Sequence, residues 1–156
     1  PTSNPATLPP APAQPQPTPQ PTPTSTPAVR PEALLAEAQA LADQGRLDQA
    51  EKLASQAAAQ LQPVAFLLLS VLRETRGDLV GAVEALRKAL YLSPQLAQGH
   101  AHLSSLLRRQ GRTEEAARSR NNALEALRAL PDDAQLPGLA PMTAGALRDA
   151  LKRGLS

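Results

Sequence analysis

The sequence predicts an all-α protein made of three helical hairpins stacked side by side, followed by a capping helix. The first observation is an internal repeat: a glycine followed five residues later by an alanine recurs three times, and successive glycines are 32 and then 34 residues apart. The second is composition, because aromatic residues make up 1% of the chain and cysteine and tryptophan are absent, which leaves a core of leucine, alanine and valine. The third is the recurrence of apolar residues at the spacing of one helical face.

Residues 1–30 are predicted to be a proline-rich, disordered linker. Twelve of the chain's 17 prolines lie before residue 32, and Arg30 is the only charged residue among the first 30. Proline fixes φ and removes a backbone donor, so such a segment cannot bury a core and forms an extended spacer. A docking role on grooves of the SH3 or WW type stays open. Because the chain begins at Pro1 without a secretory signal pattern, we expect it to be a piece of a longer protein.

The first repeat is expected at residues 31–62. Proline is well suited to the first position of a helix, which places the helix start at Pro31. Gly45 is expected to end this helix, since glycine adopts the left-handed conformation without a Cβ penalty. Ala50 then lies where the second helix crosses the first closely, and a larger side chain there would overpack the hairpin.

The second and third repeats are expected at residues 63–96 and 97–130, with the same arrangement. Asp78 and Thr113 are expected to cap the second helix of their repeats, and Pro94 to close the second hairpin. The positions that define the repeats are Gly45, Ala50, Gly77, Ala82, Ala89, Pro94, Gly111, Ala116 and Ala123.

Apolar residues mark the inner face of each predicted helix. In the first helices they are Leu34, Ala38, Leu41, Phe66, Leu69, Leu72, Leu103, Leu106 and Leu107. In the second helices they are Ala50, Leu53, Ala57, Leu61, Ala82, Leu86, Ala89, Leu90, Ala116, Ala123, Leu124 and Leu127. No hairpin can bury its own stripe, so the stacking of neighbours must supply the core.

The C-terminal segment is expected to be a loop at residues 131–142 and a helix at 143–154. Three prolines punctuate the loop. Thr143 is a good N-cap, and Met142 and Leu147 stand at the positions of a hydrophobic staple. We expect this helix to cover the open end of the stack, as stacked repeats require. A detachable amphipathic helix that binds a partner is the alternative.

About 100 residues of the chain resemble the tetratricopeptide-repeat family, on the 34-residue period and the small Gly and Ala positions. The resemblance implies a short right-handed superhelix with a concave face lined mainly by the first helices. Where the family usually has an aromatic residue the chain has Leu34, Phe66 and His100, and where the family usually has a large apolar residue it has Ala54, Leu86 and Arg120. The departures therefore fall in the first and third repeats.

The family's register implies a partner-binding groove with an apolar floor and a basic rim. Its members would be Val64, Leu67, Val71, Gln98, Ala101, Ser105, Arg108 and Arg109. We expect this face to accept an extended or helical peptide with an apolar anchor and an acidic end, held by bidentate arginine contacts. That both arginines are merely solvated is the alternative.

A second resemblance is to the C-terminal repeat domain of bacterial chemoreceptor methyltransferases of the CheR type, the Wsp-like ones in particular. It rests on residues 87–94, 100–103, 109–117, 122–124 and 139–147. In that family a separate catalytic domain uses S-adenosylmethionine to methylate receptor glutamates, and the repeat domain follows a variable linker. The resemblance therefore implies a non-catalytic fragment, with the cofactor bound only upstream.

The residues themselves indicate no catalytic, cofactor or metal site. His100 and His102 are two residues apart on a predicted helix and point to different sides, so they cannot share a metal. No glycine-rich loop follows a strand. The formal charge is +2 with acids and bases interleaved, which does not favour nucleic acid. No apolar run approaches the roughly 20 residues that would span a membrane, so no membrane insertion is expected.

Protein binding is therefore the expected function. The leading hypothesis is a cytoplasmic interaction domain that localises or regulates a chemoreceptor glutamate methyltransferase by binding a protein or peptide, such as a chemoreceptor or another component of the chemosensory array. Self-association stays open. The alternative is a repeat scaffold of a cell-envelope assembly protein, tethered by the proline-rich spacer.

Overall fold

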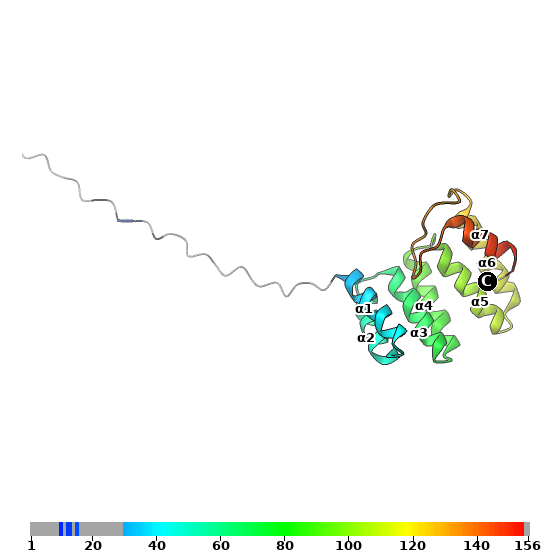
Figure 1. Cartoon of the computed structure of the whole chain (residues 1–156), viewed down its shortest axis with the longest axis horizontal. Helices are drawn as coiled ribbons and strands as arrows, with labels where there is room; N and C mark the ends of the chain where they lie inside the picture. Colours follow the sequence, from blue (N-terminus) through cyan, green and yellow to red (C-terminus); the bar gives the residue numbers. More distant parts are fainter. Residues whose placement is uncertain (1–9, 11, 14, 16–29, 155–156) are drawn as a thin grey trace, which may run out of the picture.

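The computed structural model describes residues 10, 12, 13, 15 and 30–154, so the predicted linker lies almost wholly outside the described residues. The described chain contains α1 (Pro31–Asp43), α2 (Leu47–Ala58), α3 (Pro63–Thr75), α4 (Leu79–Leu92), α5 (Ala97–Arg109), α6 (Thr113–Leu127) and α7 (Ala144–Lys152). These helices form three hairpins stacked in chain order, with α7 against the end of the stack (Figure 1). The predicted all-α fold class, with its capping helix, is confirmed.

Glycine conformation sets the turn within each hairpin. Gly45, Gly77 and Gly111 have φ of 75°, 83° and 76°, and each lies between the two helices of its hairpin. A side chain in this left-handed region is strained, which is why glycine recurs at this point. The alanines that follow five residues later are buried in the crossing of the two helices.

The helix starts match the sequence expectation at Asp78 and differ from it at Thr113. The Asp78 carboxylate accepts a hydrogen bond from the Gly81 N–H at 2.8 Å and caps α4. Thr113 is already the first residue of α6, and the capping position is Arg112, whose side chain makes no capping bond. The prediction that Thr113 caps α6 is therefore wrong, because this helix begins one residue earlier than a threonine cap requires.

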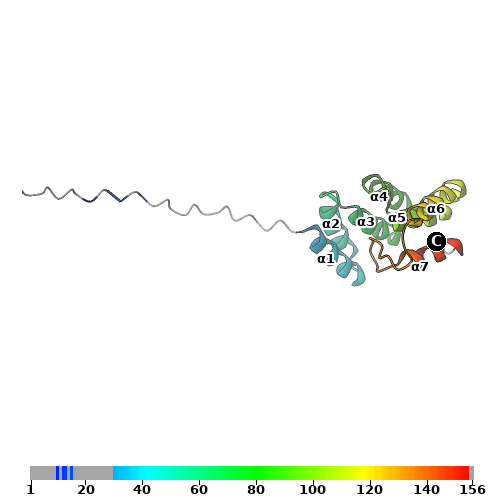
Figure 2. The ribbon, with the colours of Figure 1, turned by 90° about the horizontal axis from the view of Figure 1, so that it is seen from above.

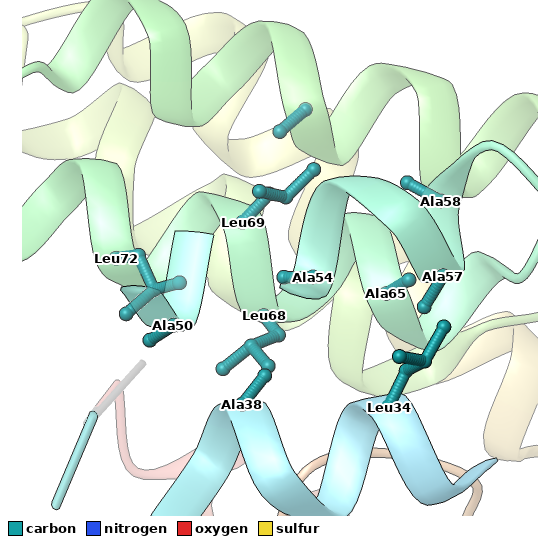
Figure 3. Packing of buried hydrophobic residues seen from close by; sticks show 11 residues of the cluster. Leu34, Ala38, Ala50, Ala54, Ala57, Ala58, Ala65, Leu68, Leu69 and Leu72 are labelled. Atoms are coloured by element: carbon teal, nitrogen blue, oxygen red, sulfur yellow. The ribbon is translucent and has the colours of Figure 1, made fainter. Parts of the chain in front are cut away.

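The core is a series of three apolar clusters. The first joins α1, α2 and α3, the second joins α4 and α5 with Leu67 of α3, and the third joins α5, α6 and α7. Figure 3 shows Leu34 and Ala38 of α1 pointing toward Ala57 of α2 and Leu68 of α3. Each cluster is built from neighbouring hairpins, as expected for a stack whose units cannot fold alone.

Leu61 does not belong to the inner face of α2, which corrects the sequence expectation. The helix ends at Ala58, and Leu61 has a φ of 57° and is 67% exposed. Its N–H donates to the Ala58 carbonyl at 2.9 Å, so it sits in a turn closed just before Pro63. The residue before a proline favours an extended conformation, and the helix must end ahead of it.

Two arginines, Arg148 and Arg120, fasten α7 to the stack. The Arg148 guanidinium donates to the carbonyls of Leu127 and Leu130 at 2.7 and 3.0 Å, just where α6 ends. Arg120 donates to the Leu151 carbonyl at 2.8 Å, near the end of α7. The Leu127 and Leu151 carbonyls lie in the last turns of α6 and α7, where carbonyls point away from the helix and can accept further bonds. The bond to Leu151 also explains why Arg120 stands where a large apolar residue is usual.

The segment between α6 and α7 forms a closed loop. Its base is held by backbone hydrogen bonds from Leu136 to Met142 and from Ala144 to Ala134, at 2.9 and 2.8 Å. We call the tip of this loop, residues 137–141, the strap. Figure 2 shows the segment running back from the α6 end of the stack toward α3 and α1. Among the described residues no helix has the length and apolar character needed to cross a membrane.

Candidate functional site

A hollow of about 340 Å³ lies on the side of the stack formed by the first helices of the second and third repeats. We call it the groove. Five of its lining residues belong to the predicted set: Leu67, Val71, Gln98, Ala101 and Ser105. They come from α3 and α5, and their spacing of three or four residues puts them on one face of each helix. The lining also includes His102, Leu139, Ala140, Met142, Leu147 and Ala150, which makes the groove mainly apolar.

The remaining three predicted residues do not line the groove. Val64 is half-buried one turn before Leu67 and outside the lining. Arg108 donates to the Gly154 carbonyl at 3.2 Å, because the end of α7 returns past the end of α5. Arg109 forms an ion pair with Glu74 of α3. Both arginines thus have a partner within the chain, and neither lines the groove.

Glu74 connects α3 to α5 at the edge of the groove. It pairs with Arg109 and also contacts His102, whose Nε2 lies 2.7 Å from its Oε2. His102 thus lines the groove with its ring fixed by a carboxylate. His100, on another side of α5, donates from Nε2 to the Pro94 carbonyl at 2.8 Å. The two histidines are engaged separately, and the described residues hold no group of three His, Cys, Asp or Glu suited to a metal.

The strap forms one side of the groove through Leu139 and Ala140, and two glutamines hold it in place. The Gln39 amide of α1 donates to the Leu139 carbonyl at 3.1 Å, and the Gln98 amide of α5 donates to the Ala140 carbonyl at a long 3.4 Å. The Leu139 side chain packs against both the first and the second core clusters. Sequence reasoning missed this contact, because a proline-punctuated loop carries no periodicity that would assign it a position.

A second hollow of about 420 Å³ lies around α4, away from the groove. It is lined by Leu61, Phe66, Arg87, Lys88, Tyr91 and Leu92. The side chains include the chain's single phenylalanine and its single tyrosine, and Tyr91 is 87% exposed. Sequence reasoning missed this hollow as well, although a tyrosine outside the apolar stripe of its helix was a visible signal.

Glu115 of α6 pairs with an arginine at the start of its own helix and with one of α4. Arg112 holds Glu115 with two donors at 2.8 and 2.7 Å, and this contact lowers the pKa of the Glu115 carboxyl below its ordinary value. Arg87 of α4 lies 3.6 Å from the same carboxylate and contributes to the lowering. Such exposed pairs contribute little stability each, so their effect is to orient the helices.

Comparisons with known proteins give both a sequence relative and a fold. No family model matches the chain. The chain is 37% identical over 95 residues to "Probable biofilm formation methyltransferase WspC" of Pseudomonas putida, a match that covers 60% of this chain and 22% of that protein. PcrH in complex with the chaperone binding region of PopB has a TM-score of 0.66 at 17% identity, covering 79% of this chain and 92% of that one. The Sgt2 TPR domain from Aspergillus fumigatus has a TM-score of 0.61 at 16% identity, covering 80% and 78%.

The chain has the fold of a tetratricopeptide-repeat domain. At 16–17% identity the likeness to the solved structures concerns the fold alone. The similarity in sequence to WspC adds that this repeat domain resembles part of a methyltransferase, of which it spans 22% of the length.

Proposed function

We propose that this repeat domain binds a segment of another protein in the groove between α3, α5 and the strap. The observation that carries the proposal is the groove itself, a mainly apolar hollow on the first-helix side of the stack. Burying apolar surface there favours binding by about 25 cal/mol per Å², against which stand the entropy and desolvation costs of association. The fold supports the assignment, because a structure of similar fold, PcrH, has been solved in complex with the chaperone binding region of PopB.

The proposed setting is a chemoreceptor methyltransferase of the Wsp-like kind. The similarity to WspC supports it. In this proposal the repeat domain is the non-catalytic part that localises or regulates the enzyme, and its partner is a chemoreceptor or another component of the chemosensory array. S-adenosylmethionine and the receptor glutamates then concern residues outside this chain.

Two valines provide a matched test. Val71 lines the groove and is half-buried, whereas Val80 is 66% exposed on α4 and lines neither hollow. A carboxylate in the groove must lose its hydration when an apolar anchor binds, which is costly. Val71→Asp is therefore expected to weaken binding of the cytoplasmic fragment of the cognate chemoreceptor at least tenfold, and Val80→Asp to leave it unchanged.

The measurement is the Kd by isothermal titration calorimetry, with circular dichroism showing that both variants remain helical. Equal affinities for Val71→Asp and the unaltered chain would remove the groove from the proposal. Loss of binding in Tyr91→Ala with none in Val71→Asp would move the contact to the second hollow.

A further inference from the structure

We propose that the strap lies along one side of the groove as an internal peptide, and that a partner segment of the same chemistry binds there by displacing it. This rests on the proposed function, and it adds the nature of the ligand and a means of regulation. The segment that fits is extended and uncharged, with one leucine-like side chain between small residues.

The first argument is the position of Leu139. The base of the loop belongs to the third core cluster through Leu136 and Met142. Leu139 instead contacts the first and second clusters, two repeats back along the chain. It remains only partly buried there, at the edge of both clusters. The strap therefore extends from the end of the stack onto the face where a partner segment is proposed to bind.

The second argument is the way the strap is recognised. Gln39 and Gln98 donate to the main-chain carbonyls of two consecutive residues, Leu139 and Ala140. Carbonyls are common to all segments, so these donors would accept any chain that runs extended along the groove. A Cβ at Gly138 would lie 1.9 Å from the Gln98 Oε1, so a larger residue there would displace the Gln98 amide that binds the Ala140 carbonyl. No lysine or arginine lines the groove among the described residues, which favours an uncharged segment over an acidic one.

The third argument is that the strap can leave without unfolding the rest. Its base keeps the backbone bonds at Leu136 and Ala144, and α7 keeps its arginine contacts. The tip has only the two glutamine bonds and one half-buried leucine, and Pro137, Ala140 and Pro141 are exposed. A tethered ligand competes at an effective concentration in the millimolar range for a short connection. The apparent affinity for a partner is therefore the intrinsic affinity multiplied by the fraction of time that the strap leaves the site free.

The test uses the strap sequence as a probe in trans. A labelled synthetic peptide of residues 134–143 is titrated into the full chain, into Leu139→Ser and into Leu130→Ser, with fluorescence anisotropy as the signal. Leu130 is 38% exposed and lies outside the strap and the groove, so it controls for the same chemical change. We expect Leu139→Ser to bind the peptide at least tenfold more tightly than the other two chains. The same peptide with serine in place of Leu139 should not bind to any of the chains.

A second variant guards against misfolding. Replacing residues 137–141 by five glycine and serine residues keeps the base of the loop and should bind the peptide as Leu139→Ser does. Equal binding by all chains, or none by any, would overturn the inference. If the receptor fragment still binds and is weakened by Val71→Asp, the proposed function survives that failure. If Leu139→Ser binds the peptide more tightly but Val71→Asp leaves receptor binding unchanged, the inference about the strap is supported. The proposed function is then contradicted.

Discussion

Two buried serines show how single side chains decide local stability in this aliphatic core. The Ser104 hydroxyl donates to the Ala116 carbonyl at 2.8 Å and so joins α5 to α6. The Ser70 hydroxyl is fully buried on α3 and has no hydrogen-bond partner among the described residues. A buried hydroxyl without a partner costs about 1–3 kcal/mol of desolvation, whereas a satisfied one contributes about 1 kcal/mol.

The two serines should therefore respond to alanine with opposite signs. Ser70→Ala is expected to raise the free energy of unfolding by about 1 kcal/mol, and Ser104→Ala to lower it by a similar amount, because the bond that joins α5 to α6 is lost. Urea unfolding followed by circular dichroism measures both. A loss of stability in Ser70→Ala comparable to that in Ser104→Ala would show that the Ser70 hydroxyl is bonded.

At the scale of elements, the seating of α7 depends on a close backbone approach. Gly145 lies in the first turn of α7, and its N–H donates to the Asp132 carbonyl at 3.0 Å. A Cβ on Gly145 would lie 2.9 Å from the Asp132 Cβ and 3.0 Å from its carbonyl oxygen. Backbone atoms cannot move aside as a flexible side chain can, so the small residue is required by packing.

Gly145→Ala tests which of two opposing effects is larger. Alanine favours a helix over glycine by up to about 1 kcal/mol, while overpacking costs about 1–3 kcal/mol. We expect a net loss of stability, concentrated in α7, seen as faster amide hydrogen exchange there than in α1 and α2. Ala146→Gly, at an exposed position of the same helix, measures the propensity effect alone. Slower exchange in α7 of Gly145→Ala would contradict the packing argument.

The sequence predicts the helices and hairpins well. It does not predict the contacts between helices that are distant in the sequence. Gly45, Gly77 and Gly111 recur at a fixed period, and this local signal places three hairpins without any knowledge of packing. The groove floor at Leu67 and Ala101 follows from the same period. The partners of Arg108 and Arg109 cannot be predicted from the repeat period, because they depend on where the end of α7 and Glu74 lie in space. The position of the strap could not be predicted for the same reason, since no local sequence signal relates Leu139 to Gln39, 100 residues away.

At the scale of the whole molecule, the strap adds a contact between the first repeat and the segment that follows the third repeat. The three core clusters follow one another along the chain, and contacts between neighbours alone would let the ends of such a stack open independently. Leu139 and its carbonyl connect the end of the chain to α1 through Gln39. A partner that displaces the strap would therefore also loosen the first repeat from the last.

The most direct test is amide hydrogen exchange of the full chain with and without the chemoreceptor fragment. We predict slower exchange in α3 and α5 beside the groove and no change around Tyr91. Slower exchange confined to α4, around Tyr91, would contradict the groove as the site of binding.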